Sequence, residues 1–376
     1  MVGSMARSGL LSMKQTALTG SALRLPPLPS PRDLIKLYKL RARKQLSQNF
    51  LLDTRITDKF AKSAGKIEGA DVCEVGPGPG SITRSILKRH PGRLIVIEKD
   101  PRFLPFLQML EEASQSRMNV VVGDVLSLDM SKMFRESLRL SWEDTCPDIH
   151  LIGNLPFSVS TPLIIRWLRD ISLKQNAWSY GRVRMTLTFQ KEVAERTVAE
   201  ANGRQRCRLS VMCQNWCDVK HLYNIPGSAF VPPPEVDVGV VTFRPKIEPT
   251  IKGDFHLIEK VVRQMTCFRQ KYCITCAGTL FPEHLRKQLS HKMLDIAEVN
   301  PETRAFQLTM DEFQRLVMAY EHLCSDQPKL FKYKFSSNVD EDVWMEDEDA
   351  TTFTSTSNKE GLAADGFSDK DVEPKV

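Results

Sequence analysis

The sequence lacks any run of about 18 consecutive apolar residues, the length that a membrane-spanning helix needs. We therefore predict a soluble protein with no membrane partner. It also lacks the paired CxxC motifs of a zinc ribbon, because its nine cysteines are scattered and Cys273-Ile274-Thr275-Cys276 stands alone. A tetrahedral zinc site needs further ligands at suitable spacing, so we predict no metal and a reducing compartment.

Acidic residues are missing from the N-terminal end, where none precedes Asp33. The first 32 residues are rich in Leu, Ala and Ser and contain Arg7, Lys14, Arg24 and Arg32. This composition is typical of an organellar transit peptide. We predict a transit peptide over residues 1–32 and a location in the mitochondrial matrix, with the disordered start of a cytosolic protein as the alternative.

Negative charge gathers at the other end of the chain. Residues 336–376 hold twelve acids against Lys359, Lys370 and Lys375, so this tail carries −9 and residues 1–335 carry +15 of the net +6. A body this basic favours nucleic acid as partner, because Lys and Arg bind phosphates without regard to sequence. The tail has too few apolar residues to offset the entropy of ordering, and we expect it to be disordered.

Short apolar runs alternate with amphipathic stretches of helix length from Asp71 onward, as in a mostly parallel sheet with crossover helices. We predict a Rossmann-like, doubly wound α/β sheet with strands at residues 71–75, 93–97, 119–122, 149–152 and 183–189. Helices should cover residues 81–89, 101–112 and 161–169, the last with Pro162 in its first turn.

The sheet should end in an antiparallel pair. Residues 218–224 and 235–243 are rich in β-formers, and in the second run Val236, Val238 and Val240 occupy alternate positions. The pattern of residues after Lys246 no longer predicts strands, and residues 254–320 are predicted to form several helices. We therefore predict an α/β domain over residues 33–245 and a small all-helical domain over residues 246–335.

A glycine loop, Glu74-Val75-Gly76-Pro77-Gly78-Pro79-Gly80, lies between the first predicted strand and helix. Glycine lets the backbone turn sharply and approach a ligand closely. The spacing is GxGxG with an acid before it, and the dinucleotide fingerprint GxGxxG is absent. The loop therefore favours a methyltransferase over a nicotinamide dehydrogenase.

Two further acids stand at the ends of the next strands. Glu98 follows Leu94-Ile95-Val96-Ile97, where a carboxylate can accept hydrogen bonds from both hydroxyls of a ribose. Asp124 ends the third strand, where it could accept from the adenine amine of the cofactor while the backbone of Val125 contacts the ring. Any one acid could be an ordinary strand-end carboxylate, but three in register with a glycine loop indicate a nucleoside site.

The tetrapeptide Asn154-Leu155-Pro156-Phe157 follows the fourth strand and suits methylation of adenine N6. This amine is a poor nucleophile, because its lone pair is delocalised into the ring. The side-chain carbonyl of Asn154 and the backbone carbonyl of Leu155 can each accept an N6 hydrogen and favour an sp³-like nitrogen. Pro156 stiffens the turn and Phe157 can stack on the base. Catalysis then rests on orientation in a water-poor site rather than on a general base.

Several longer motifs accompany these two. They are Lys44-Gln45-Leu46-Ser47-Gln48-Asn49-Phe50-Leu51, Trp142-Glu143-Asp144, Phe189-Gln190-Lys191-Glu192-Val193-Ala194-Glu195-Arg196 and Ala229-Phe230-Val231-Pro232-Pro233-Pro234-Glu235-Val236. With these motifs, the chain resembles the ribosomal RNA adenine N6,N6-dimethyltransferase family from about residue 36 to 334. The insertion with Trp142 resembles that of the mitochondrial branch of the family. The resemblance implies a class I methyltransferase sheet and S-adenosylmethionine bound by Gln48, Asn49, Leu51, Gly76, Gly78, Glu98, Lys99, Asp124, Val125 and Asn154.

The resemblance also implies a substrate. Members of the family place four methyl groups on two adjacent adenines in a hairpin near the 3′ end of small-subunit ribosomal RNA, and the helical domain assists RNA docking. The implied partners are mitochondrial small-subunit RNA and the assembling subunit, and we expect a monomer. A nucleic-acid-binding protein that serves the mitochondrial transcription machinery is the alternative. A DNA adenine methyltransferase would need a target-recognition domain, which the sequence lacks.

Clustered basic residues are the candidates for RNA binding. The strongest cluster is Gly203-Arg204-Gln205-Arg206-Cys207-Arg208, because three guanidiniums within five residues can bind phosphates bidentately. We predict RNA contacts from Arg204, Arg206, Arg208 and Lys44. Weaker candidates are Arg41, Arg43, Arg182, Arg184, Lys191 and the stretch 263–271.

Overall fold

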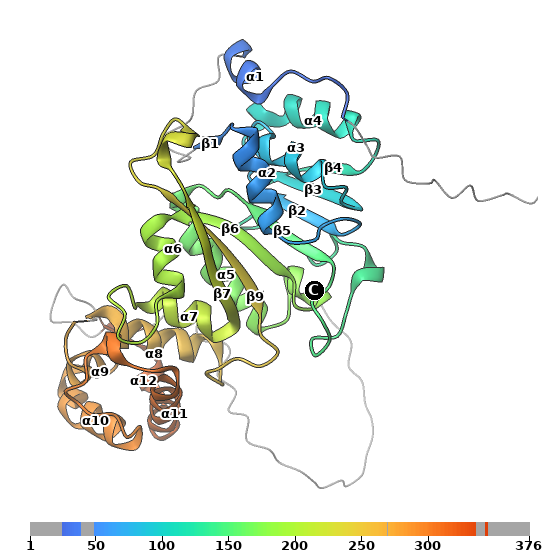
Figure 1. Ribbon diagram of the computed structural model, residues 1–376. Coiled ribbons are helices and arrows are strands. Elements are labelled where there is room, and N and C mark those ends of the chain that lie inside the picture. The colour runs from blue at the N-terminus through green and yellow to red at the C-terminus, as the bar shows by residue number, and fades with distance from the viewer. Residues whose placement is uncertain (1–24, 39–48, 269, 336–342, 345–376) are drawn as a thin grey trace, which may run out of the picture.

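The computed structural model describes residues 25–38, 49–268, 270–335 and 343–344. Among them, a seven-stranded sheet forms the centre of the larger part of the molecule (Figure 1). Most of the predicted transit peptide, the segment with Lys44 and Gln48, and almost all of the acidic tail lie outside the described residues. No helix within the described ranges is long and apolar enough to cross a membrane.

The sheet is mostly parallel, with strand order β4-β3-β2-β5-β6-β9-β7. Its first five strands are mutually parallel, and β9 runs antiparallel to both of its neighbours. The predicted Rossmann-like sheet with an antiparallel end is therefore confirmed. The strands are β2 (Asp71–Val75), β3 (Arg93–Glu98), β4 (Met118–Val122), β5 (Ile149–Gly153), β6 (Arg184–Gln190), β7 (Cys217–Ile225) and β9 (Val238–Pro245).

Helices bury both faces of this sheet, which explains why its central strands are continuous apolar runs. In β3, Leu94 and Val96 point to one hydrophobic core, and Ile95 and Ile97 point to the other. The first core includes side chains from α2 (Thr54–Ser63), α3 (Ser81–Leu87) and α4 (Leu104–Ala113), and the second includes side chains from α5 (Phe157–Ser172) and α7 (Arg208–Trp216). The other α-helices of this part are α1 (Pro31–Leu37) and α6 (Lys191–Val198).

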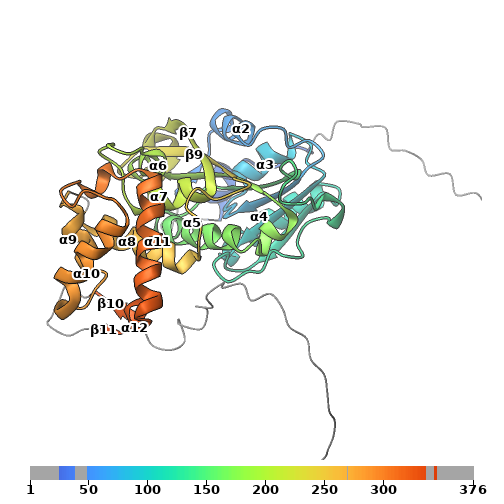
Figure 2. The ribbon, with the colours of Figure 1, turned by 90° about the horizontal axis from the view of Figure 1, so that it is seen from below.

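The sequence predicts several helices after the last strand of the sheet, and the part of the chain that the structure describes contains five α-helices there. They gather at the end of the molecule away from β4 (Figures 1 and 2). Their buried residues join the same core that underlies α5 and α7, so apolar packing is continuous between the two parts. These helices are α8 (Phe255–Cys267), α9 (Cys273–Gly278), α10 (Glu283–Ile296), α11 (Met310–Asp326) and α12 (Lys329–Lys332). The small pair β10 (Tyr333–Lys334) and β11 (Val343–Trp344) follows.

Several predicted elements have slightly different bounds, and two of these differences change the place of a named residue. The helix expected from residue 161 begins at Phe157, so Pro162 lies inside it rather than in its first turn. The strand expected from residue 235 begins at Val238, because Asp237 is used in a loop, where its carbonyl accepts from Lys191 N at 2.8 Å and its carboxylate accepts from Gly227 N at 3.0 Å.

Candidate active site

The glycine loop makes a tight turn at the carboxyl end of β2. Gly76, Gly78 and Gly80 have φ angles of 68°, 54° and 79°, a region that disfavours residues with a Cβ. A Cβ on Gly78 would lie 3.1 Å from the ring of Phe50, and one on Gly80 would lie 2.6 Å from Leu110. The loop therefore needs glycine both for its conformation and for its close packing.

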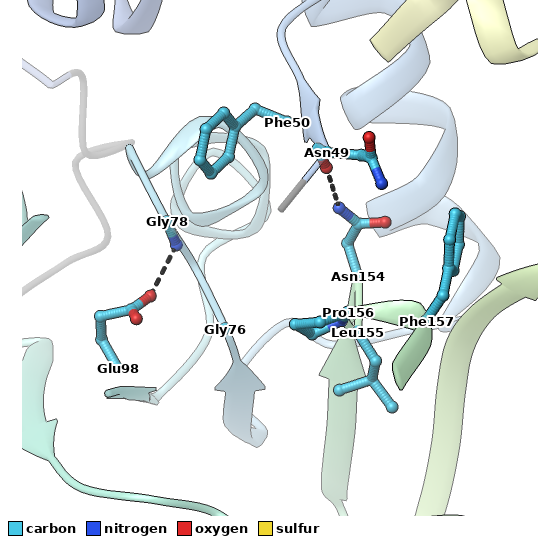
Figure 3. Close-up of a pocket in the computed structure, with 9 residues that line it drawn as sticks. All are labelled: Asn49, Phe50, Gly76, Gly78, Glu98, Asn154, Leu155, Pro156 and Phe157. Carbon is cyan, nitrogen blue, oxygen red and sulfur yellow. Dashed lines mark hydrogen bonds between the residues drawn. The ribbon is translucent and has the colours of Figure 1, made fainter. Parts of the chain in front are cut away.

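Glu98 lies opposite this loop, at the end of the neighbouring strand β3. Its carboxylate is 6% exposed and accepts from Gly78 N at 3.0 Å and from Asp100 N at 2.7 Å (Figure 3). Burial raises the pKa of Glu98, and the two backbone N–H groups partly offset this rise. Each oxygen retains a second lone pair, so the carboxylate can still accept from two hydroxyl groups.

Asp124 stands beyond Glu98, after β4. One of its oxygens lies 2.6 Å from Lys99 Nζ and the other accepts from Leu126 N at 3.0 Å. The hydrogen bond from Lys99 lowers the pKa of Asp124. A hollow brings together predicted cofactor residues from four strand ends. Its lining includes Gly76, Glu98, Lys99, Asp124, Val125, Leu155 and Pro156.

Asn154 follows β5 and is held at both ends of its amide. Its Nδ2 donates to the carbonyl of Asn49 at 3.0 Å, and its Oδ1 accepts from the hydroxyl of Thr188 at 2.8 Å. Figure 3 shows its side chain turned toward Asn49. A second, adjoining hollow is lined by Asn49, Phe50, Gly76, Gly78, Glu98 and the tetrapeptide Asn154, Leu155, Pro156 and Phe157. The four residues of the tetrapeptide and most of the predicted cofactor residues therefore line these two adjoining hollows, whereas Gln48 lies outside the described residues and Leu51 lines neither hollow.

The tetrapeptide runs directly into a helix. The carbonyl of Pro156 accepts from Val159 N and Ser160 N at 3.0 and 3.1 Å, so α5 begins at Phe157. Phe157 is partly exposed and stands on the side of Asn154 away from Glu98 (Figure 3). Its ring therefore borders the smaller hollow on the side away from Glu98.

Two residues of this site escaped the sequence reasoning. Phe50 packs over Gly78 and lines the smaller hollow, whereas its predicted neighbour Leu51 is 3% exposed and packs in the core. The short pair of β1 (Phe50–Leu51) with β8 (Phe230–Val231) sets this alternation. Thr188 lies inside β6, where no motif marks it. The strand alternation could have revealed Phe50, but nothing local could have revealed Thr188.

Comparisons of the chain with known proteins agree with this geometry. The family model described as ribosomal RNA adenine dimethylase matches residues 39–320. The chain belongs to the ribosomal RNA adenine dimethylase family. Relatives from Macaca fascicularis and Homo sapiens, each named dimethyladenosine transferase 1, mitochondrial, are 54% and 53% identical to this dimethylase, over 85% of its chain and 92% of their own. A relative of the same name from Drosophila melanogaster is 48% identical over 85% of the chain and 96% of its own.

A solved structure supports the fold. The dimethyladenosine transferase from Plasmodium falciparum superposes with a TM-score of 0.55 and 21% sequence identity, over 72% of this chain and 96% of that one. Family and relatives together confirm the predicted enzyme class, ribosomal RNA adenine dimethyltransferase, and the predicted mitochondrial location. The family and its methyltransferase fold imply use of S-adenosylmethionine.

The arginines predicted to contact RNA differ in their exposure to solvent. Arg206 is 2% exposed and donates to the Ala199 carbonyl and to Gln214 Oε1, at 2.8 and 2.6 Å, so the prediction that it binds phosphate is wrong. Arg182, a weaker candidate, is likewise buried, at 5% exposure, and donates to the carbonyl of Trp142 at 2.9 Å. Both guanidiniums satisfy carbonyl groups inside the protein.

The other two arginines of the cluster are accessible. Arg208 is partly exposed and pairs with Glu259 of α8. Arg204 is exposed. Lys44 lies outside the described residues. RNA contacts from Arg204, Arg208 and Lys44 therefore stay predictions. The three guanidiniums of the cluster do not form a joint phosphate site, because that of Arg206 is buried.

The buried acid Glu74 of the dimethylase gives a pH-dependent prediction. Burial is the main cause that raises the pKa of Glu74 from 4.5 to about 8. Below about pH 4.5 the carboxyl is protonated in both the folded and the unfolded state, and its contribution to the free energy of unfolding is greatest. As the pH rises to about 8 only the folded state keeps the proton, so this contribution falls by up to about 1.4 kcal/mol per pH unit. Glu74→Gln should raise the free energy of unfolding at pH 8.5 and change it little at pH 5.

Urea unfolding at the two pH values measures this difference. The exposed residue Glu68 provides the control, because Glu68→Gln should change stability little at either pH. A Glu74→Gln variant that gains nothing between pH 5 and pH 8.5 would contradict the assignment of a buried, protonated carboxyl.

Proposed function

We propose that this dimethylase transfers methyl groups from S-adenosylmethionine to N6 of two adjacent adenines in the 3′-terminal hairpin of mitochondrial small-subunit ribosomal RNA. The modification would support assembly of the small subunit in the matrix. The observation that carries the proposal is the Asn154 amide, held by hydrogen bonds at 2.8 and 3.0 Å beside the glycine loop and Glu98. The relatives' name, dimethyladenosine transferase 1, mitochondrial, supports the same reaction and compartment.

The residues of the larger hollow fit the proposed cofactor. Gly76 lines the hollow without a side chain, Glu98 has lone pairs for a ribose, and Asp124 with the Val125 backbone can contact an adenine. Gln48, Asn49 and Lys99 stay further cofactor contacts in this proposal, and Leu51, whose side chain packs in the core, could contribute only backbone atoms. When bound, the cofactor supplies an electrophilic methyl group on a positively charged sulfur.

The tetrapeptide would orient the target base. Asn154 Oδ1 and the Leu155 carbonyl accept the two N6 hydrogens, so the nitrogen lone pair is turned out of conjugation and toward the methyl group. Phe157 stacks on the ring, a contact worth roughly 1–3 kcal/mol at comparable nucleic-acid sites. Because each group acts only on orientation, the chain lowers the barrier by positioning rather than by proton transfer.

The lining of the hollow suits a reaction that disperses charge. Val75, Ile97 and Leu155 are buried at the strand ends that form its wall. Such a wall excludes water from the reacting atoms. No strong base is required, because methyl transfer places a positive charge on the amine nitrogen, and the resulting cation is acidic enough to lose its proton to water.

A labelling experiment with matched RNAs tests the proposed substrate. The full chain is incubated with methyl-labelled S-adenosylmethionine and small-subunit RNA that carries the terminal hairpin. We expect incorporation to approach four methyl groups per RNA and to vanish when both adenines are replaced by guanine. Promoter DNA serves as a second control. Equal labelling of both RNAs, or promoter binding without any RNA labelling, would contradict the proposal and favour a binding protein.

A further inference from the structure

The register of the sheet brings Thr188 to the side chain of Asn154. β5 and β6 are parallel, and their pairing ends where Gly153 stands opposite Leu187. The next residues along the two strands are Asn154 and Thr188, so the two side chains meet at the carboxyl edge of the sheet. The Thr188 hydroxyl lies 2.8 Å from Asn154 Oδ1, and Thr188 is fully buried.

The Asn49 carbonyl decides which way the amide of Asn154 points. A backbone carbonyl can only accept, so the Asn154 atom 3.0 Å from it must be the NH₂ group. The oxygen of the amide then faces Thr188, whose hydroxyl must donate to it. In the reversed orientation two acceptors, Asn154 Oδ1 and the Asn49 carbonyl, would face each other without a hydrogen.

From this geometry we propose that Thr188 is a positioning residue, which holds Asn154 Oδ1 where it accepts a hydrogen of the target amine. The inference rests on the role proposed for Asn154 in the preceding section. Thr188 takes one lone pair of Oδ1 and leaves the other for the substrate. Its hydroxyl sits on a rigid central strand, so the orientation of the amide is fixed before any base enters.

The second methyl transfer should depend on Thr188 more than the first. Adenine N6 has two hydrogens, which Asn154 Oδ1 and the Leu155 carbonyl can share. After one methylation a single N–H remains, so one misplaced acceptor leaves the nitrogen without a fixed orientation. Loss of the Thr188 hydroxyl should therefore slow the second transfer and let N6-monomethyladenosine accumulate.

Thr188→Val removes the hydroxyl and keeps the shape of the side chain. We expect kcat to fall about tenfold to a hundredfold, as for other small displacements of a catalytic group, with the Kd for S-adenosylmethionine unchanged. The ratio of monomethylated to dimethylated adenosine should rise. Thr188→Ser restores the donor and should return both kcat and the product ratio toward wild type.

Thr186 offers a matched control. It lies two residues earlier in the same strand, on the same face, and is 4% exposed. Thr186→Val should leave the product ratio unchanged, and thermal unfolding of each variant shows whether its fold is retained. If Thr188→Val has a wild-type rate and product ratio, the positioning role is overturned.

The same experiment separates this inference from the proposed function. If the wild-type chain fails to methylate the hairpin, the proposed function fails and the positioning role of Thr188 fails with it. If the wild type is active but Thr186→Val and Thr188→Val lose activity equally, with no change in product ratio and no rescue by serine, only the positioning role fails. A Thr188-specific change in product ratio that serine reverses supports it.

Discussion

Asn154→Ala should lower kcat for methyl transfer by about two to three orders of magnitude, the usual effect of removing one group that binds the transition state. The variant loses the acceptor that holds adenine N6, and alanine offers no replacement. Loss of the two amide hydrogen bonds, to Asn49 and from Thr188, should also destabilise the fold by roughly 1–3 kcal/mol. RNA affinity should change little, because phosphate contacts supply most of it.

Asn215→Ala is the matched control for this variant. Asn215 is a buried asparagine that, like Asn154, has both ends of its amide engaged, since it donates to the Ile251 carbonyl at 3.2 Å and accepts from Ile251 N at 2.5 Å. It lies on α7, outside both hollows. Asn215→Ala should therefore lose stability but keep kcat below its melting temperature. Equal losses of kcat in the two variants would show that Asn154 acts only on the fold.

Glu98→Ala should weaken the binding of S-adenosylmethionine by about ten- to a hundredfold, because a hydrogen bond to a charged group contributes about 1.5–3 kcal/mol. The substitution also leaves Gly78 N and Asp100 N without the acceptor that now holds them, so the glycine loop loses a support. Titration calorimetry with the cofactor measures the change. The defect should appear in Kd, whereas that of Asn154→Ala should appear mainly in kcat.

Acid pH should reproduce part of this defect in the wild-type chain. Burial raises the pKa of Glu98, so the carboxylate takes up a proton at a higher pH than an exposed glutamate does. Protonation replaces an acceptor by a donor, and cofactor affinity should therefore fall as the pH drops. Glu98→Gln should bind weakly with less dependence on pH. Glu111→Ala is the control, because Glu111 accepts from Val120 N at 3.1 Å but does not line the hollows.

The strands, and the predicted cofactor residues at the carboxyl edge of the sheet, could be predicted from the sequence because their signals are local. β2 begins at Asp71 and ends at Val75, as the apolar run predicts, and glycine spacing marks the loop that follows. Glu98 and Asp124 are placed by the rule that parallel strands end at one edge. Each of these inferences needs only a short window of sequence.

The contacts that were missed join distant parts of the chain. Thr188 meets Asn154 across 34 positions, and this pairing depends on the register of β5 against β6. Arg206 belongs to a run that favours phosphate binding, but a carbonyl and Gln214 surround its guanidinium in the fold. A charged side chain is therefore assigned to RNA or to the interior only when its tertiary neighbours are known.

Nucleoside mass spectrometry of the RNA product tests the central claim most directly. Hairpin RNA is treated with the wild-type chain or with Asn154→Ala in the presence of S-adenosylmethionine, digested, and analysed for methylated adenosines. We predict that the wild type yields two N6,N6-dimethyladenosines per hairpin and that Asn154→Ala yields almost none at equal RNA occupancy. Dimethyladenosine at wild-type levels from Asn154→Ala, or methyl groups on any atom other than adenine N6, would contradict the account.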